Sequence, residues 1–378
     1  MTGSRTWGAL RPIAIRFTLL AIFAAALVGA LVAIPQTATA GVTYEVNSLG
    51  DDDDAVAGSG GCDTGADVVI NSVTVDECTL RAAITEANVS GANTITFNPK
   101  VFNPGIIVVD PAGVGCDLTV DLLPQIEVSL TIDATGADVT LDGAGACPVG
   151  LTVSYSTPGL NFSLIGDGSN FTIEGFSGGF PITAGVLVCG GDFFAGLFAA
   201  CFGTTLDSIS IDGVTIRDSE YGVGVLGPNI NNLTITNNDI STPAFATDGS
   251  GGVAAIGVAI FGASGGIDGI DGTNLIEFLF AELDLGDLSG ALTELFDDVI
   301  GVGALSDSEI IIGGSEGNGN SLSGGISGVL GTFSGVLGSA IDVTVSHNDE
   351  LAGESGPGVT LAYCGDADEV SQINFDVS

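Results

Sequence analysis

The stretch Glu77-Cys-Thr-Leu-Arg-Ala-Ala-Ile-Thr-Glu-Ala-Asn88 is the one clear helical segment between positions 41 and 140, and it decides which fold the sequence indicates. Small apolar residues recur along it at i, i+3, i+4 and i+7, as on the buried face of an amphipathic helix: Leu80, Ala83, Ile84 and Ala87. We expect Gly91 to end this helix. Alternating β-branched residues over 42–46 and 94–97 predict a strand on either side of it.

This helical segment resembles the CSLREAI domain, which is the N-terminal module of many exported bacterial β-helix proteins. The matching motif residues are Cys78, Leu80, Arg81 and Ile84, and the similarity extends over about residues 42–145. Two residues depart from the family pattern, Thr79 in place of its Ser and Ala82 in place of its Glu. The resemblance implies an N-terminal cap on a right-handed parallel β-helix (pectin-lyase-like), and it implies no known chemistry.

The sequence after residue 140 supports the same architecture. Short β-branched segments alternate with Gly, Asn and Asp turns, for example at 162–165, 209–211 and 233–235. Six apolar anchors follow one another at nearly equal steps in the sequence, which is typical of a solenoid: Leu141, Leu164, Val186, Ile209, Leu233 and Ile256. We therefore predict an all-β, right-handed parallel β-helix. An antiparallel sandwich or barrel is the alternative.

Four regions follow from this interpretation. Residues 1–40 are the expected signal peptide, 41–140 the CSLREAI-like cap with one short α-helix, and 141–378 the β-helix coils. Residues 268–305 have helical periodicity without turn clusters, so we expect a helical or lid-like insertion there. Irregular strands of further coils are the alternative for that segment.

The first forty residues have the composition of an export signal. Arg5, Arg11 and Arg16 precede an apolar run over 17–34, and small residues follow up to Ala40. Cleavage near Ala40 predicts a secreted or cell-surface protein without a transmembrane span. A retained membrane anchor is the alternative, because an apolar run of this length can just cross a bilayer.

The charge of the chain is strongly one-sided, with 46 Asp and Glu against 6 Lys and Arg. Three of the six basic residues lie in the expected signal peptide, so the rest carries 3 − 46 = −43. Such a surface repels nucleic acid, whose binding requires clusters of Lys and Arg. The apolar content of 45% also excludes disorder over the whole chain.

Seven cysteines fit an oxidising compartment. Pairing between near neighbours is the simplest prediction, although six cysteines permit 15 connectivities. It joins Cys62 with Cys78, Cys116 with Cys147 and Cys189 with Cys201, and leaves Cys364 without a near neighbour.

Few residues could carry catalysis. β-Helix enzymes that cleave acidic sugars need Lys, Arg or His near the scissile bond, and the only weak candidates are Arg217 and His347. A salt bridge is the simpler role for Arg217, and a turn position is the simpler role for His347. The net charge would also repel polyuronates.

Calcium is the one cofactor that the sequence suggests, because Asp248, Asp268 and Asp271 place carboxylates on Gly-rich loops. Ordinary acidic turns explain the same residues. Two functions therefore remain open. One is a non-catalytic acidic rod that binds a polysaccharide, the matrix or a cell-envelope protein, and the other is a carbohydrate-active enzyme on a neutral or calcium-bridged polysaccharide.

Overall fold

The computed structural model describes most of the chain from residue 41 onward. The described residues are 41–91, 94–109, 116, 121–154, 159–168, 170–177, 183–189, 205–219, 221–226, 229–243, 256–261, 308–313, 315, 319–323, 327–333, 339–352, 359–363 and 370–378. All described strands and the helix belong to one compact unit, Val42–Ser378.

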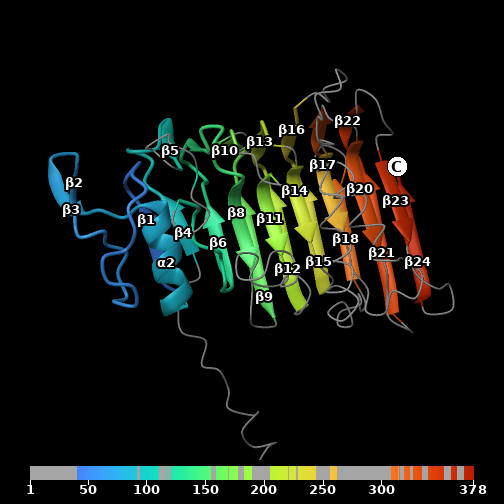
Figure 1. Cartoon of the computed structure of the whole chain (residues 1–378), viewed down its shortest axis with the longest axis horizontal. Helices are drawn as coiled ribbons and strands as arrows, with labels where there is room; N and C mark the ends of the chain where they lie inside the picture. Colours follow the sequence, from blue (N-terminus) through green and yellow to red (C-terminus); the bar gives the residue numbers. More distant parts are fainter. Residues whose placement is uncertain are drawn as a thin grey trace, which may run out of the picture. The chain divides into compact units, whose positions relative to one another are not determined.

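The strands form three parallel sheets and one small antiparallel sheet (Figure 1). In spatial order, sheet A contains β1 (Thr43–Val46), β4 (Thr94–Phe97), β6 (Leu130–Asp133), β9 (Leu160–Ile165), β12 (Thr205–Asp212), β15 (Asn229–Thr236), β18 (Ser308–Gly313), β21 (Ser339–Ser346) and β24 (Val370–Val377). Sheet C contains β5 (Gly105–Val108), β7 (Val139–Asp142), β10 (Phe171–Glu174), β13 (Thr215–Arg217), β16 (Asp239–Ser241), β19 (Ser321–Ser323) and β22 (Asp349–Ala352). Sheet D contains β8 (Val149–Ser154), β11 (Ala184–Cys189), β14 (Tyr221–Leu226), β17 (Ile256–Phe261), β20 (Ser327–Phe333) and β23 (Val359–Tyr363). Sheet B is the hairpin of β2 (Asp67–Ile70) and β3 (Val73–Asp76).

The chain visits sheets A, C and D in turn. From β9 onward each passage through the three sheets, here called a coil, adds one strand to each sheet, and the new strand pairs in parallel with the strand of the preceding coil. The predicted all-β fold with parallel sheets and a short helix is therefore confirmed, and its topology is solenoid-like. The antiparallel sandwich or barrel is wrong, because only the β2–β3 pair is antiparallel among the described strands.

Branched aliphatic side chains fill the interior because inward positions stay in register from coil to coil. In sheet A the inward column is almost entirely β-branched or Leu: Tyr44, Ile95, Ile132, Leu164, Ile211, Ile235, Ile312 and Val345. Sheet C contributes Ile107, Leu141, Ile173, Ile216, Ile240 and Leu322 in the same way. All of these side chains are buried and belong to one hydrophobic core.

The six apolar anchors, although nearly equally spaced in the sequence, do not stack in one column. Among them only Ile209 and Leu233 are register partners. The next partner of Leu233 is Ile310, and the following one is Val343, so the steps in sequence along this column are very unequal. The anchors came from three different sheets, so an equal spacing in sequence did not correspond to one stacked column.

The helix α2 (Leu80–Ser90) begins and ends as the sequence predicts. Thr79 is its N-cap, and its side chain accepts a hydrogen bond of 3.0 Å from the backbone N–H of Ala82. Gly91 ends the helix with a left-handed φ of 70°, which glycine adopts without a steric penalty. The predicted apolar face is buried in the core that β1 and β4 also line: Leu80, Ala83, Ile84 and Ala87.

The expected boundary at residue 140 lies inside β7, and sheets A and C both run across it. The expected insertion at 268–305 lies between β17 and β18 in the sequence. Like the expected signal peptide at 1–40, it is outside the described residues.

A ladder of asparagines lies inside the turn between sheets A and C. Asn238, Asn320 and Asn348 occupy this turn in three successive coils. The Asn320 side chain donates to the carbonyl of Ile235 at 2.8 Å and to Asn348 Oδ1 at 3.0 Å. Its own Oδ1 accepts from the backbone and side-chain nitrogens of Asn238, both at 3.0 Å. The ladder therefore gives hydrogen-bond partners to the buried backbone N–H of Asn238 in the turn and to the carbonyl of Ile235 near the end of β15.

Replacing Asn320 with Ala should destabilise the protein strongly. The change removes the acceptor of the buried Asn238 backbone N–H and the side-chain donor to the Ile235 carbonyl, and an unsatisfied buried group costs about 1–3 kcal/mol. We expect the unfolding free energy, measured by urea denaturation, to fall by at least about 2 kcal/mol. Asn161→Ala, on the exposed outer side of sheet A, is the control and should change it by less than about 0.5 kcal/mol. Equal effects of the two substitutions would contradict the ladder.

Glycines form a second column, at the start of the sheet D strands. Gly150, Gly185 and Gly222 each lie between two residues that pair with the neighbouring coil. A Cβ on Gly222 would lie 2.2 Å from Cγ2 of Ile240 and 2.6 Å from the carbonyl oxygen of Gly257. The inward aliphatic column of sheet C therefore occupies the space that a side chain would need here.

Gly222→Ala should consequently lower the melting temperature, because overpacking of a core costs about 1–3 kcal/mol. Gly61→Ala is the matched control, since its Cβ would meet only Ser59 Oγ, at 3.9 Å. Differential scanning calorimetry should show a lower melting temperature for Gly222→Ala alone. A Gly222→Ala protein as stable as Gly61→Ala would show that the coil can shift to accept the extra methyl group.

Candidate functional site

The outer side of sheet A carries a column of hydroxyl side chains. Register pairing joins six consecutive strands from β1 to β15 in this column: Thr43, Thr94, Thr131, Ser163, Ser210 and Thr234. Ile311 interrupts the column and Thr344 resumes it. Thr43 is exposed and the other five of the six are half-buried, whereas the residues that alternate with them are buried in the core. Because parallel strands lie about 4.8 Å apart, the hydroxyl groups repeat at that interval.

Carboxylates and further hydroxyl groups flank this hydroxyl column. Two residues further along each strand lie Glu45, Thr96, Asp133 and Asp212, in register with one another except at Ile165 of β9. Thr236 Oγ1 donates to Asp212 Oδ1 at 2.7 Å, so neighbouring coils are also joined by side-chain hydrogen bonds. The outer side of sheet A is therefore a polar surface with a negative charge.

Arg217 lies on the outer side of sheet C and is paired. Its guanidinium Nε donates to Oε2 of Glu174, which occupies the same register position in the preceding coil. Half of the Arg217 side chain is exposed, and the pair spans adjacent strands rather than a turn. The carboxylate of Glu174 therefore neutralises the charge of Arg217, the catalytic candidate on this face.

His347 serves the turn between β21 and β22. Its backbone has a φ of 56°, in the left-handed region, and its side chain is exposed. Asn237 has the same conformation, with φ of 58°, at the equivalent place before the ladder residue Asn238. The expectation that His347 stands at a turn position usual for asparagine agrees with this geometry.

The two catalytic candidates are not brought together. Arg217 ends β13, whereas His347 precedes β22, three strands further along sheet C. Three steps between parallel strands amount to about 14 Å. A shared reaction centre for both side chains is therefore not formed in this structure.

The cap motif residue Arg81 is the centre of a buried polar cluster. Its guanidinium forms a salt bridge with Asp51, with Nη2 and Oδ2 2.6 Å apart, and both side chains are less than a tenth exposed. It also donates to the carbonyl oxygens of Asp121 and Leu122, both at 2.6 Å. Arg81 thus ties the acidic loop at 51–54 to a distant segment at 121–122. Glu77, four residues before Arg81, accepts instead from the hydroxyl groups of Ser48 and Thr64.

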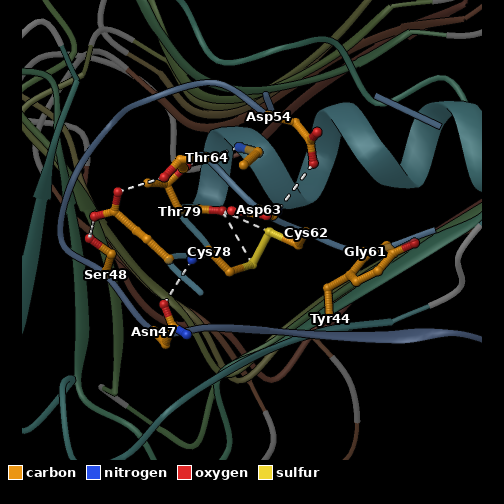
Figure 2. The surroundings of a disulfide bond; sticks show 12 residues. Tyr44, Asn47, Ser48, Asp54, Gly61, Cys62, Asp63, Thr64, Cys78 and Thr79 are labelled. Atoms are coloured by element: carbon orange, nitrogen blue, oxygen red, sulfur yellow. Dashed lines mark hydrogen bonds between the residues drawn. A yellow bond between two sulfur atoms is a disulfide. The ribbon is translucent and has the colours of Figure 1, made fainter. Parts of the chain in front are cut away.

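The other three residues of the CSLREAI-like motif are also buried: Cys78, Leu80 and Ile84. Figure 2 shows Cys78 bonded to Cys62 beside the N-cap Thr79, with the side chain of Asn47 directed at Cys78. Asn47 Oδ1 accepts from the backbone N–H of Cys78 at 2.8 Å. The motif therefore positions the start of α2 against the end of β1.

Two predicted disulfides are confirmed, Cys62–Cys78 and Cys116–Cys147. The third pairing lies outside the described residues, because Cys201 is not among them.

The calcium candidates Asp248, Asp268 and Asp271 also lie outside the described residues. Within the described part of the chain, no group of three or more His, Cys, Asp or Glu side chains is arranged to hold a metal ion. The same part of the chain contains no helix with the length and apolar character that a membrane span needs.

Sequence reasoning missed the Asn ladder and the hydroxyl column. Short Thr-Ile or Ser-Ile pairs recur in the sequence, as in 94–95, 131–132, 210–211 and 234–235. They could have been aligned by their alternating pattern, but the unequal lengths of the coils hide their common register.

No protein-family model matches the chain, and no curated protein or solved structure is significantly similar to it.

Burial raises the pKa of the Asp51 carboxyl above its usual range, although the hydrogen bond and charge of Arg81 oppose the shift. The folded protein then binds this proton more tightly than the unfolded chain does, so protonation favours the folded state. The contribution is fully present below the unfolded pKa, near the ordinary value of 3.8, and is lost as the pH rises through the folded-state pKa.

Comparison with Asp51→Asn isolates this effect, because asparagine does not titrate. We expect the unfolding free energy of the wild type, relative to that of Asp51→Asn, to increase as the pH is lowered from 7 towards 3.5. Urea denaturation of both proteins at matched pH measures this difference in unfolding free energy. The contributions of the other acidic residues are the same in both proteins and cancel in the difference. A difference that decreases on acidification would mean that the ion pair with Arg81, rather than burial, controls the carboxyl group.

Proposed function

We propose that this chain is an exported, non-catalytic binding module, built as a right-handed parallel β-helix, that binds a neutral polysaccharide on the outer side of sheet A. The observation that carries the proposal is the column of Thr and Ser side chains in register over six consecutive strands. Hydroxyl groups are both donors and acceptors, which suits the hydroxyl groups of sugars.

The right-handed winding is part of this proposal. Successive coils connect parallel strands of one sheet through other strands, and such crossovers are right-handed in about 98% of cases. The resemblance of the Cys78–Ile84 segment to the CSLREAI cap and the signal-like residues 1–40 support export.

A repeating surface favours a repeating ligand. A polymer that contacts one coil can contact the next in the same way, and linked weak contacts raise the overall affinity without any new kind of contact. The flanking carboxylates Asp133 and Asp212, and the excess of acidic residues in the whole chain, repel polyanions. Neutral polysaccharides are therefore the favoured class over polyuronates.

The two catalytic candidates support the non-catalytic interpretation. Arg217 is paired with Glu174, and His347 has a turn conformation that the backbone requires. Each residue thus has a structural role, so neither supports the alternative of a carbohydrate-active enzyme by supplying a catalytic group.

Three substitutions in the hydroxyl column test the proposal. Thr131→Lys, Ser163→Lys and Ser210→Lys together should abolish retention of the protein on the insoluble neutral polysaccharide that the wild type binds, measured by co-sedimentation with a panel of such polymers. The outward lysines cover the column but leave the inward core unchanged.

The matched control places the same charge on sheet C, with Thr140→Lys, Thr172→Lys and Thr215→Lys. This protein should be retained like the wild type. Equal loss in both triple variants would locate binding elsewhere, and failure of the wild type to bind any neutral polymer of the panel would reject the proposed ligand class.

A further inference from the structure

The segment Cys62–Cys78, here called the hairpin arm, contains β2 and β3. Its strands pair only with each other among the described strands, and Figure 1 shows them at one end of the described chain, beyond β1 and α2. The turn residues Asn71 and Ser72 both have positive φ, 49° and 68°, which suits a two-residue hairpin turn. No described strand pairs with either outer edge of the arm, although the carbonyl of Asp76 in β3 accepts from the Asn47 side chain at 2.9 Å.

The arm is held in shape at its base. The Cys62–Cys78 disulfide closes it, and next to this bond the backbone of Glu77 pairs with Thr64 and Ala66 at 2.9 and 2.8 Å. The Thr64 hydroxyl also donates to Oε2 of Glu77 at 2.7 Å. A two-stranded hairpin is only marginally stable by itself in water. These bonds, together with the packing of Cys78 in the hydrophobic core, therefore hold the base of the arm in a fixed conformation.

One face of the arm is entirely apolar. Val68 lies opposite Val75, and Ile70 lies opposite Val73, so the four side chains share one side of the hairpin. Val73 is 58% exposed, and the other three are only partly buried. The exposed Val73 beside three half-buried apolar side chains gives the arm a small apolar surface, a feature that interaction sites share.

The other face of the arm carries a repulsive pair of charges. Asp67 lies directly opposite Asp76, and like charges in that position destabilise a strand pair. No Lys or Arg occurs between Cys62 and Cys78. A partner with Lys or Arg next to these two carboxylates would relieve the repulsion, whereas a second copy of this acidic chain would increase it.

We propose that the hairpin arm is a docking element that accepts an extended, basic segment of a partner protein as a third β-strand. The partner strand would pair with a free edge of the arm, place its apolar residues over the face of Val68, Ile70, Val73 and Val75, and direct its basic residues at Asp67 and Asp76. Because the arm is already fixed by its disulfide, little ordering opposes binding.

A short synthetic peptide of alternating Val and Lys, labelled with a fluorophore, is the probe. Its binding to the secreted protein is measured by fluorescence anisotropy at physiological ionic strength, beside a peptide of equal composition with the lysines in one block. We expect the alternating peptide to bind at least about tenfold more tightly than the blocked one, because only alternation separates the two faces of a strand.

Two single substitutions then separate the faces of the arm. Val73→Thr, on the apolar face, should weaken binding of the alternating peptide about tenfold. Val69→Thr makes the same change at a valine that is 70% exposed on the opposite face, and should leave the affinity within about twofold. Equal affinity for the two peptides, or equal effects of the two substitutions, would show that general electrostatic attraction explains the binding. Either result would overturn the proposal.

The acidic pair provides a test that does not disturb the apolar face. Asp67→Asn with Asp76→Asn should weaken binding of the alternating peptide more than Asp133→Asn with Asp342→Asn, which removes equal charge from the outer side of sheet A. If both double variants weaken it equally, the arm does not recognise the lysines. A dimer of the wild type in sedimentation that Val73→Thr dissociates would replace the basic partner with a second copy and overturn the proposal as well.

Discussion

Parallel pairing in register between successive coils is the constraint on which the rest of this structure depends. A single coil buries none of its interior alone, so its inward residues must meet those of the coils before and after it. The column from Ile95 to Val345 in sheet A shows the consequence, since nearly every inward position carries Ile, Leu or Val. A polar residue in such a column would lose packing in three coils at once.

The turns must accept the same register, and two residue types make this possible. Asparagine at 238, 320 and 348 returns hydrogen bonds to backbone groups that leave the sheets at the turn. Glycine at 150, 185 and 222 gives space to the aliphatic column that enters from sheet C. Both columns follow from the close approach of neighbouring coils at their corners, so neither is a local property of one turn.

Local features were predictable from the sequence, whereas long-range register was not. The helix with its caps at Thr79 and Gly91 and the Cys62–Cys78 bond depend on residues close in the chain. The partners of Leu233, by contrast, are Ile209 and Ile310, one near in the sequence and the other far, because the coils differ in length. Arg81 shows the same limit, since its ionic partner is Asp51 in a loop rather than Glu77 one helical turn before it. Alternation in one strand reveals its inward side but contains no information about which other strand it meets.

Register also explains where recognition can occur in this chain. Inward positions are occupied by packing, and an outward residue type that repeats in every coil becomes a continuous column, as in Thr94, Thr131 and Ser163. The distance between two side chains in different coils, such as Arg217 and His347, is set by the number of coils between them. No loop of the described chain brings these two residues together. The proposed polysaccharide would bind along such a column, because an extended ligand can contact several coils in the same way. The hairpin arm is independent of this register, since its disulfide and its own strand pair fix its shape. For that reason it can present apolar residues to a different kind of partner without disturbing the coils.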